Sequence, residues 1–378
     1  DQGKTTMTEK MLQVMGDFAL QLWNEHSGAF TLSNGQQWEN DPVTCSLNCW
    51  PGELAYFWIE RIRWRYIHDP DSWNGFDADE KDAIHHFIED EGDFSRPVWT
   101  ALLVNINMLH SLDKEDVESW LFDLMGKAGT EFIWNSILPN PNFNIRLIDI
   151  FFYKSCIDEF EYLSHLSEYK RQSFLLQVFR MITYGELKEK QRTRLLSKVV
   201  TVENGAYAAL FMDQVAWAFE FRLDSKDRDM VWDLWLHQFI EDRHAGKRRN
   251  WGEEERVAFA KLVPLLGAHL KEGAEYLSDS FPKVTGYDLN ETIMLDNIDC
   301  IPQECAEAFI AFYKRLFMQP GVFHVWKAEE LLQKLANKFG MDKVSSLASL
   351  AKEKRIIPDT WNFSPKKEIH SDGKEGEA

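Results

Sequence analysis

The sequence predicts an all-α protein, built as an irregular α-solenoid or HEAT-like helical repeat array. Apolar residues recur at three- and four-residue steps nearly throughout the 378 residues, and no strong strand-type alternation is visible. The connections between these segments are short and rich in Asp, Ser, Gly and Pro. Serial helix pairs without a strand framework bury their apolar faces on one another, as in a solenoid. No fixed repeat period is present, so we expect the array to be irregular.

The first helix is predicted from an apolar stripe near the start of the chain. Met11, Met15 and Phe18 recur at helical spacing and lead into Leu22 and Trp23. This pattern defines one amphipathic helix, whose apolar stripe is expected to hold its neighbours. The stretch that follows is polar and contains Asn34-Gly35, which predicts a long loop over 27–50 with room for a short hairpin.

A helix start is predicted at Pro51, because a proline in the first helical turn loses no hydrogen bond. Glu53 complements the positive end of the helix dipole, and Asp69-Pro70-Asp71 ends the helix. The same reasoning predicts the later helices at 77–89, from Asp93 or Ser95 to 112, and at 115–126, 130–138 and 143–163. Beyond Ser167 we expect a helix that Gly185 ends and another that Glu186 begins, followed by helices at 205–221, 227–243, 253–267, 302–317, 326–339 and 342–355.

The chain is longer than one compact core usually is, so we expect two lobes. Pro139 and Pro141 give a firm stop between helices. We therefore place an N-terminal helical lobe at 1–140, including the loop at 27–50, and a C-terminal helical-repeat lobe at 141–363; a division at 198–205 is the alternative. The charged, Gly-containing stretch 364–378 is predicted to be a disordered tail. The polar start at Asp1, without Met, indicates a piece of a longer polypeptide or a trimmed chain.

Charge and cysteine usage restrict the partners and the compartment. A net charge of -19 repels phosphate backbones and anionic membranes, so nucleic acid is disfavoured and no membrane association is expected. No apolar run approaches the roughly 20 residues that cross a bilayer. The odd count of 5 cysteines fits a reducing cytoplasm better than a disulfide framework.

Several short motifs are better explained by structure than by chemistry. Gly3-Lys4-Thr5-Thr6 resembles half of a phosphate-binding loop, but no strand precedes it. Cys45 and Cys49 are spaced too loosely for the usual zinc knuckle, and the pair Cys300 and Cys305 lies some 250 residues away. We therefore interpret these four cysteines as ordinary buried thiols.

Histidines and carboxylates also give no catalytic signature. His85-His86 point to different faces of a helix, and His237 and His244 are two turns apart. Glu253-Glu254-Glu255 is predicted to be a solvated helix start, where negative charge is stabilised by the dipole. We therefore predict no catalytic residue, no cofactor and no metal site.

One segment departs from the acidic average and is the candidate protein-binding site. It comprises Arg243, Lys247, Arg248 and Arg249, followed by Trp251. A basic turn beside an exposed aromatic ring could dock an acidic protein patch or a phosphate. Basic residues at a helix C-terminus also interact favourably with the helix dipole. A binding role and a purely structural role are therefore both kept as interpretations of this turn. Trp50, Trp58, Trp64 and Trp73 are read as core rather than as a recognition surface.

Two segments carry a family resemblance. The run Cys49 to Trp58 resembles the "hPxGkLaeFW" opening of a helical domain of unknown function. That domain lies at the C-terminal end of bacterial anti-phage proteins that bear a sirtuin-like (SIR2) NAD-cleaving domain. Trp73–Phe76 and Leu109–Asp113 are similar to later landmarks of it, and Trp235 to Glu255 resembles its "yW..R..G.P..l..eE" stretch. The likeness spans roughly 45–285, but the usual proline after the basic turn is replaced near Arg248-Arg249-Asn250.

The resemblance implies a sensing or regulatory region of a bacterial anti-phage defence protein. Such a region would recognise a phage protein, or control an NAD-cleaving effector domain elsewhere. The resulting hypothesis is a non-catalytic protein-interaction module, with homo-oligomerisation left open. Two alternatives remain: a helical enzyme without a linear motif, hydrolase- or glycosylase-like, and an acidic structural subunit of a larger assembly.

Overall fold

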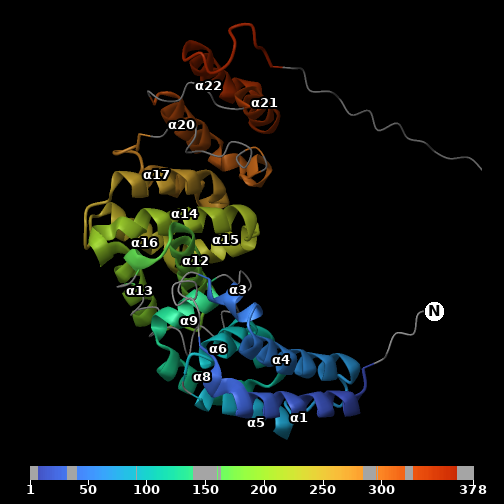
Figure 1. Ribbon diagram of the computed structural model, residues 1–378. Coiled ribbons are helices and arrows are strands. Elements are labelled where there is room, and N and C mark those ends of the chain that lie inside the picture. The colour runs from blue at the N-terminus through green and yellow to red at the C-terminus, as the bar shows by residue number, and fades with distance from the viewer. Residues whose placement is uncertain are drawn as a thin grey trace, which may run out of the picture. The chain divides into compact units, whose positions relative to one another are not determined.

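The computed structural model describes residues 7–31, 41–90, 92–138, 160, 163–283, 295, 297–319 and 327–363 (Figure 1). Within these ranges every regular element is a helix and none is a strand, which confirms the all-α fold class. Several predictions fall outside them: the phosphate-loop-like Gly3–Thr6, the turn at Asn34-Gly35, most of the helix at 143–163 and the tail at 364–378.

The chain divides into two compact units, residues 1–188 and 189–378, rather than at 140/141 as predicted. The reason is that α12 (Glu168–Tyr184) packs on α9 (Thr130–Ile137). The rings of Trp134 and Phe174 meet edge to face at 4.9 Å, and the Lys170 ammonium donates to the Asn135 side-chain oxygen at 2.8 Å. The end of α9 at Ile137 is thus not the end of the unit.

Unit 1 begins with α1 (Glu9–His26) and continues with short helices in series. They are α3 (Pro42–Leu47), α4 (Trp50–His68), α5 (Ala78–Glu89), α6 (Ser95–Val104), α7 (Ile106–Leu112), α8 (Lys114–Ala128), α9 and α12, with 3-10 turns at Ser27–Ala29 and Leu163–His165.

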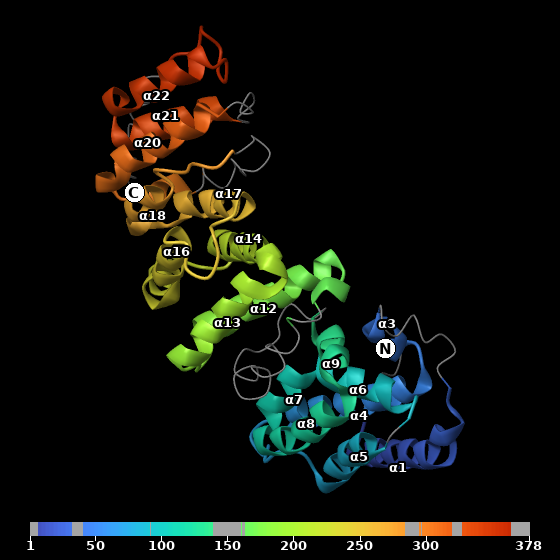
Figure 2. The same ribbon diagram turned by 90° about the vertical axis from the view of Figure 1, so that its left-hand side faces the viewer.

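The core of unit 1 is organised around α6. Eight of its ten residues are buried, including Trp99, Leu102 and Leu103, and α3, α4, α5 and α9 pack around it. A helix that is apolar on nearly all sides belongs at the centre of a bundle. By contrast α1 lies at the edge of the unit in both views, packed on α4 and, through Trp23, on Phe87 of α5 (Figures 1 and 2).

Helix ends were predicted correctly where a proline or a capping side chain marks them. Pro51 occupies the first turn of α4, and Asp69 ends it. Asp77 and Glu80 form a reciprocal capping box at the start of α5, with the Asp77 N–H donating to Glu80 at 2.9 Å. These signals depend only on residues within one turn of the helix end, so they can be read from sequence.

The long loop predicted at 27–50 is wrong at 42–47, because α3 lies there. Pro42 occupies its first turn, and the Asp41 side chain accepts the Thr44 N–H at 3.0 Å. Gly52 lets α3 pack against α4, since a Cβ at Gly52 would lie 1.9 Å from the Ser46 carbonyl oxygen. A six-residue helix is too short to show a periodic pattern, which is why the sequence did not reveal it.

The helix predicted at 95–112 is interrupted at Asn105, which separates α6 from α7. The Asn105 side chain donates to the Ala101 carbonyl at 2.9 Å and competes with the helical ladder.

Unit 2 contains the remaining helices, again as short elements. They are α13 (Glu189–Thr201), α14 (Ala206–Phe221), α15 (Ser225–Val231), α16 (His237–His244), α17 (Glu253–Leu262), α18 (Leu270–Tyr276), α20 (Ala306–Phe317), α21 (Ala328–Phe339) and α22 (Met341–Glu353), with 3-10 turns at Val202–Gly205, Val263–Leu265, Gly267–His269, Ile298–Cys300 and Gln303–Cys305.

Helices of unit 2 pack on elements that are near in the chain but not always adjacent. α13 contacts α14, α18 contacts α20, and α21 contacts α22, whereas α14 contacts α17 across α15 and α16, and α20 contacts α22 across α21 (Figure 2). Packing between elements close in the chain is expected of a helical array. The HEAT-like or solenoid arrangement itself stays a prediction.

The helix predicted at 227–243 is continuous but changes its winding. α15 passes into a π-helical turn at Trp232–Leu236 before α16 resumes the α-helical ladder. Trp232, Trp235 and Leu236 are buried here, so the wider turn directs three large side chains into the unit. Turns of this kind often accompany functional sites.

Candidate interaction surfaces

The outer face of α1 carries a row of exposed apolar side chains. Met11, Val14, Met15 and Phe18 are 40%, 61%, 42% and 64% exposed. They lie one turn apart along the helix, so they form one continuous strip, which we call the α1 outer face. Met7, 37% exposed, lies just before the helix. Contiguous exposed apolar strips of this kind mark interaction sites, whereas scattered apolar residues do not.

The inner face of α1 is held firmly in unit 1. Leu12, Gly16, Ala19 and Trp23 are buried. The Trp23 ring is fully buried, and its indole N–H donates to the Asp90 carboxylate at 2.7 Å. The outer face is therefore presented by a helix whose position is already fixed.

This arrangement corrects the prediction for the first helix. We expected Met11, Met15, Phe18, Leu22 and Trp23 to share the packing stripe, but only Trp23 of these is buried. The helix carries apolar residues over two adjacent arcs, and the fold covers only the arc that contains Leu12, Ala19 and Trp23.

The basic turn was predicted to be an exposed binding site, but its first cation, Arg243, lies inside the protein. Arg243 is 1% exposed and Glu255 is 2% exposed. The Arg243 guanidinium makes a bidentate pair with Glu255, at 2.6 Å from Nε to Oε1 and 3.0 Å from Nη2 to Oε2. It also donates to the carbonyls of Lys247, Arg249 and Asn250 at 3.1, 2.9 and 3.3 Å. Arg243 thus shapes the turn instead of contacting a partner.

Arg249 and Trp251 of the turn also have structural roles. The Arg249 guanidinium donates to Glu255 at 3.1 Å and to the Val200 and Gly205 carbonyls at 3.2 and 3.3 Å. Gly205 has a φ of +80°, which favours glycine, and a Cβ there would lie 2.1 Å from the Arg249 Nε. Trp251 is buried at 9% exposure, contrary to the exposed ring we expected. Glu255, predicted to be solvated, is instead the buried counter-ion of both arginines.

Lys247 and Arg248 are the exposed members of the predicted set. The Lys247 ammonium contacts the Asp242 carboxylate at 2.6 Å. Burial opposes ionisation of Asp242, but hydrogen bonds from Lys247 and Gln238 and the nearby Arg248 charge lower its pKa below the usual value. Arg248 also lines a cavity of about 390 Å³ between α13 and α16, whose apolar wall includes Leu196, Trp235 and Phe239.

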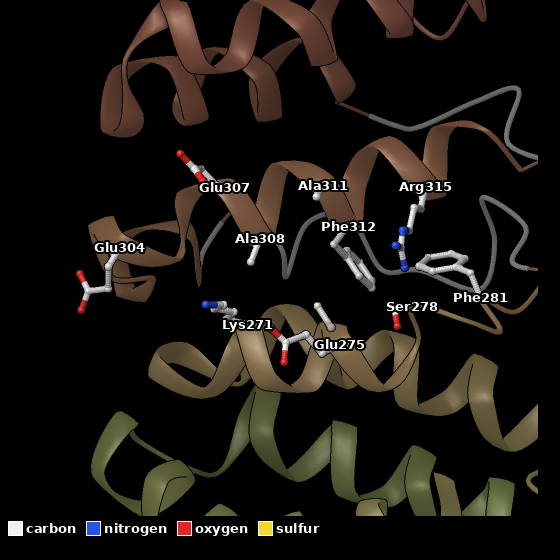
Figure 3. Close-up of a pocket in the computed structure, with 11 residues that line it drawn as sticks. Lys271, Glu275, Ser278, Phe281, Glu304, Glu307, Ala308, Ala311, Phe312 and Arg315 are labelled. Carbon is white, nitrogen blue, oxygen red and sulfur yellow. The ribbon is translucent and has the colours of Figure 1, made fainter.

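A second cavity lies between α18 and α20 and encloses about 360 Å³ (Figure 3). Its wall is formed by small and aromatic residues, Ala274, Ala308, Ala311, Phe281 and Phe312. Charged groups stand around this wall: Lys271, Glu275, Glu304, Glu307 and Arg315. Figure 3 shows the acidic Glu304 and Glu307 toward one end and Arg315 beside Phe281 at the other. The lining of this cavity contains no histidine or cysteine.

Histidines of unit 2 gather around the π-helical turn. The rings of His237 and His269 each stack on that of Trp232, with centroids 5.4 and 5.3 Å away. The His237 Nε2 lies 2.9 Å from both the Glu272 carboxylate and the Tyr276 hydroxyl. Burial, followed by the charge of Glu272, raises the pKa of Tyr276. These contacts join α16 to α18, and none of these residues lines either cavity.

The cysteines and acidic residues of the described ranges form no metal centre. No group of three or more His, Cys, Asp or Glu side chains there is placed to share an ion. Cys45, Cys49, Cys300 and Cys305 are free, and burial raises the pKa of Cys305, which favours the protonated thiol. No helix within the described ranges is long and apolar enough to cross a membrane.

The fold and surfaces together define an all-α protein with one apolar helix face left uncovered by the described residues. Comparison with known proteins adds no relative: no family model, no curated protein and no solved structure matches the chain. Sequence reasoning missed this face because it assigned the apolar residues of α1 to a single stripe. The signal that could have revealed it is the second arc, offset around the helix from Leu12 and Ala19.

Proposed function

We propose that this chain is a non-catalytic protein-interaction module that uses the α1 outer face to bind a protein. The observation that carries the proposal is the exposure of Met11, Val14, Met15 and Phe18 on a helix whose inner face is buried. A partner that covers these side chains removes apolar surface from water, at about 25 cal/mol for each Å². Because α1 is already folded, binding costs no helix formation.

The composition of this face also fits recognition of a protein. Methionine side chains are flexible and polarisable, so they adapt to the shape of an apolar partner. Aromatic residues such as Phe18 are frequent anchors of binding energy. The net charge of -19 argues against nucleic acid as the partner.

The family resemblance at 45–285 is the basis for a defence setting. In that setting the module belongs to a bacterial anti-phage protein of the cytoplasm, and its partner is a phage protein or an NAD-cleaving effector domain. The free thiols at Cys45, Cys49, Cys300 and Cys305 agree with a reducing compartment.

Site-specific photo-crosslinking tests the function. Benzoylphenylalanine replaces Phe18 in one variant and Phe221, 58% exposed on α14, in a matched control. We expect a covalent protein adduct from position 18 and none from position 221. Irradiation of cells that produce the chain, with and without phage proteins or an NAD-cleaving domain, should be followed by mass spectrometry. Absence of any protein adduct at position 18 would overturn the proposal, and adducts with neither phage protein nor effector would remove the defence setting.

A further inference from the structure

The α1 outer face is self-complementary, and we infer that its partner is a second copy of this chain, bound in antiparallel orientation. This inference rests on the proposed function and names the partner. Three features of α1 carry it: the spacing of the apolar residues, the placement of two opposite charges beside them, and the polar residues that follow them.

The apolar spacing is that of a helix-pairing seam. Met11, Val14 and Phe18 are separated by three and four residues, the alternation of positions a, d and a in a heptad. All three are exposed, and Met15 widens the seam on one side. Two such helices can interlock their side chains along this seam.

The charges beside the seam favour antiparallel pairing. Lys10 and Asp17 are seven residues apart, so both lie on the same flank of the seam, at equivalent heptad positions. Neither makes an ion pair with another described residue; Asp17 accepts a hydrogen bond from Gln13 at 3.3 Å. A twofold axis near Val14 brings Lys10 of each copy beside Asp17 of the other, and Met11 beside Phe18. Sulfur–aromatic contacts between the latter pair are favourable.

Parallel pairing is disfavoured by the residues beyond Phe18. Gln21 and Glu25 occupy the next d and a positions of the same seam, and both are exposed. A parallel pair in register would place Glu25 against its own copy within the seam, where like charges repel. An antiparallel pair centred on Val14 avoids this contact.

The size of the face predicts a weak dimer. An exposed strip of four apolar side chains offers on the order of a few hundred Å² per copy. Stable interfaces usually bury about 800 Å² per partner, so dissociation in the micromolar range is expected.

Analytical ultracentrifugation of the full chain, over a concentration series that spans the micromolar range, measures this dimer. We expect Phe18→Glu to remain monomeric throughout, whereas the matched control Phe221→Glu dimerises like wild type. Lys10→Glu and Asp17→Lys should each weaken the dimer roughly tenfold, because each places like charges across the twofold axis. The double exchange Lys10→Glu/Asp17→Lys should restore the wild-type dissociation constant. A double variant no tighter than the singles would contradict the antiparallel charge pairing.

Cysteine cross-linking reports the orientation directly. Val14→Cys lies at the proposed axis and should form a disulfide-linked dimer on mild oxidation, above the level given by the native cysteines of wild type. Gln21→Cys has the same heptad position but lies about 21 Å from its copy along the axis, at 1.5 Å per residue, which is too far for a disulfide. Equal cross-linking at both positions would indicate parallel pairing and overturn the inference.

The outcomes separate this inference from the proposed function. A chain that stays monomeric at every concentration, yet forms an adduct with another protein at position 18, overturns the second copy as partner and leaves the interaction function standing. An adduct of the chain with itself at position 18, together with loss of the dimer in Phe18→Glu, supports both the second copy as partner and the interaction function.

Discussion

The outer face of α1 and the turn 243–251 reverse the usual relation between residue type and exposure. On α1, Val14 and Phe18 are more than half exposed although they are apolar. In the turn, Arg243 and Glu255 are almost fully buried although they are charged. A strip of exposed apolar side chains is typical of a surface that a binding partner covers. A charged side chain can be buried where an opposite charge and backbone carbonyls replace its contacts with water. Exposure therefore distinguishes a surface for binding from a structural anchor, and residue type alone does not.

The largest expected effect is the loss of the buried ion pair. Arg243→Met removes the guanidinium from Glu255 and from the carbonyls of Lys247, Arg249 and Asn250. Because a buried carboxylate then loses its main counter-charge, we expect a destabilisation of about 3–5 kcal/mol. Urea denaturation of the full chain, followed by circular dichroism, measures it.

A paired variant sharpens the same test. In Arg243→Met/Glu255→Leu both charged partners are apolar, so part of the lost stability should return. If Arg243→Met alone unfolds at the wild-type urea concentration, the buried pair is not the structural anchor we describe.

The inner face of α1 should respond nearly as strongly. Trp23→Ala removes a fully buried ring and leaves the Asp90 carboxylate without its indole donor. We expect a loss of about 3 kcal/mol in the free energy of unfolding. Phe18→Ala, on the opposite face of the same helix, is the matched control. Equal losses for the two variants would show that the two faces of α1 are not distinct.

A smaller effect should appear with pH at Glu220 on α14. Desolvation raises the pKa of this partly buried carboxyl from 4.5 to about 7. The folded protein therefore holds this proton more tightly than the unfolded chain. The resulting stability is fully present below about pH 4.5 and is lost as the pH rises through about 7.

Glu220→Gln tests that sign. The neutral amide should be more stable than wild type at pH 8, by no more than about 1 kcal/mol because solvent screens the partly exposed group. The difference should vanish below pH 4.5. Thermal melts of both proteins across this range measure it, and a constant difference at every pH would contradict the raised pKa.

The smallest effects are expected at the exposed members of both regions. Phe18→Ala and Arg248→Ala should each change the unfolding free energy by no more than about 0.5 kcal/mol. The two variants should differ in association instead, with Phe18→Ala weakening the dimer and Arg248→Ala leaving it unchanged. If Arg248→Ala abolished the dimer, the binding surface would lie at the basic turn and not on α1.

The sequence by itself determined the fold class and many helix ends. Pro51, the Asp77–Glu80 capping box and Asp69-Pro70 lie where the helices begin and end, because capping depends on contacts within one turn. The periodic apolar residues likewise predicted most of the longer helices of the described ranges. Short or interrupted elements, such as α3 and the break at Asn105, gave too few residues for that pattern to be recognised.

Only the tertiary structure decided which apolar and charged residues are covered. The arc of α1 with Leu12 and Trp23 meets α4 and α5, while Phe18 meets none of the described helices closely enough to be buried. Glu255 lies where it can reach Arg243 and Arg249. Both outcomes depend on which elements pack together across long stretches of chain, and periodicity describes one helix at a time.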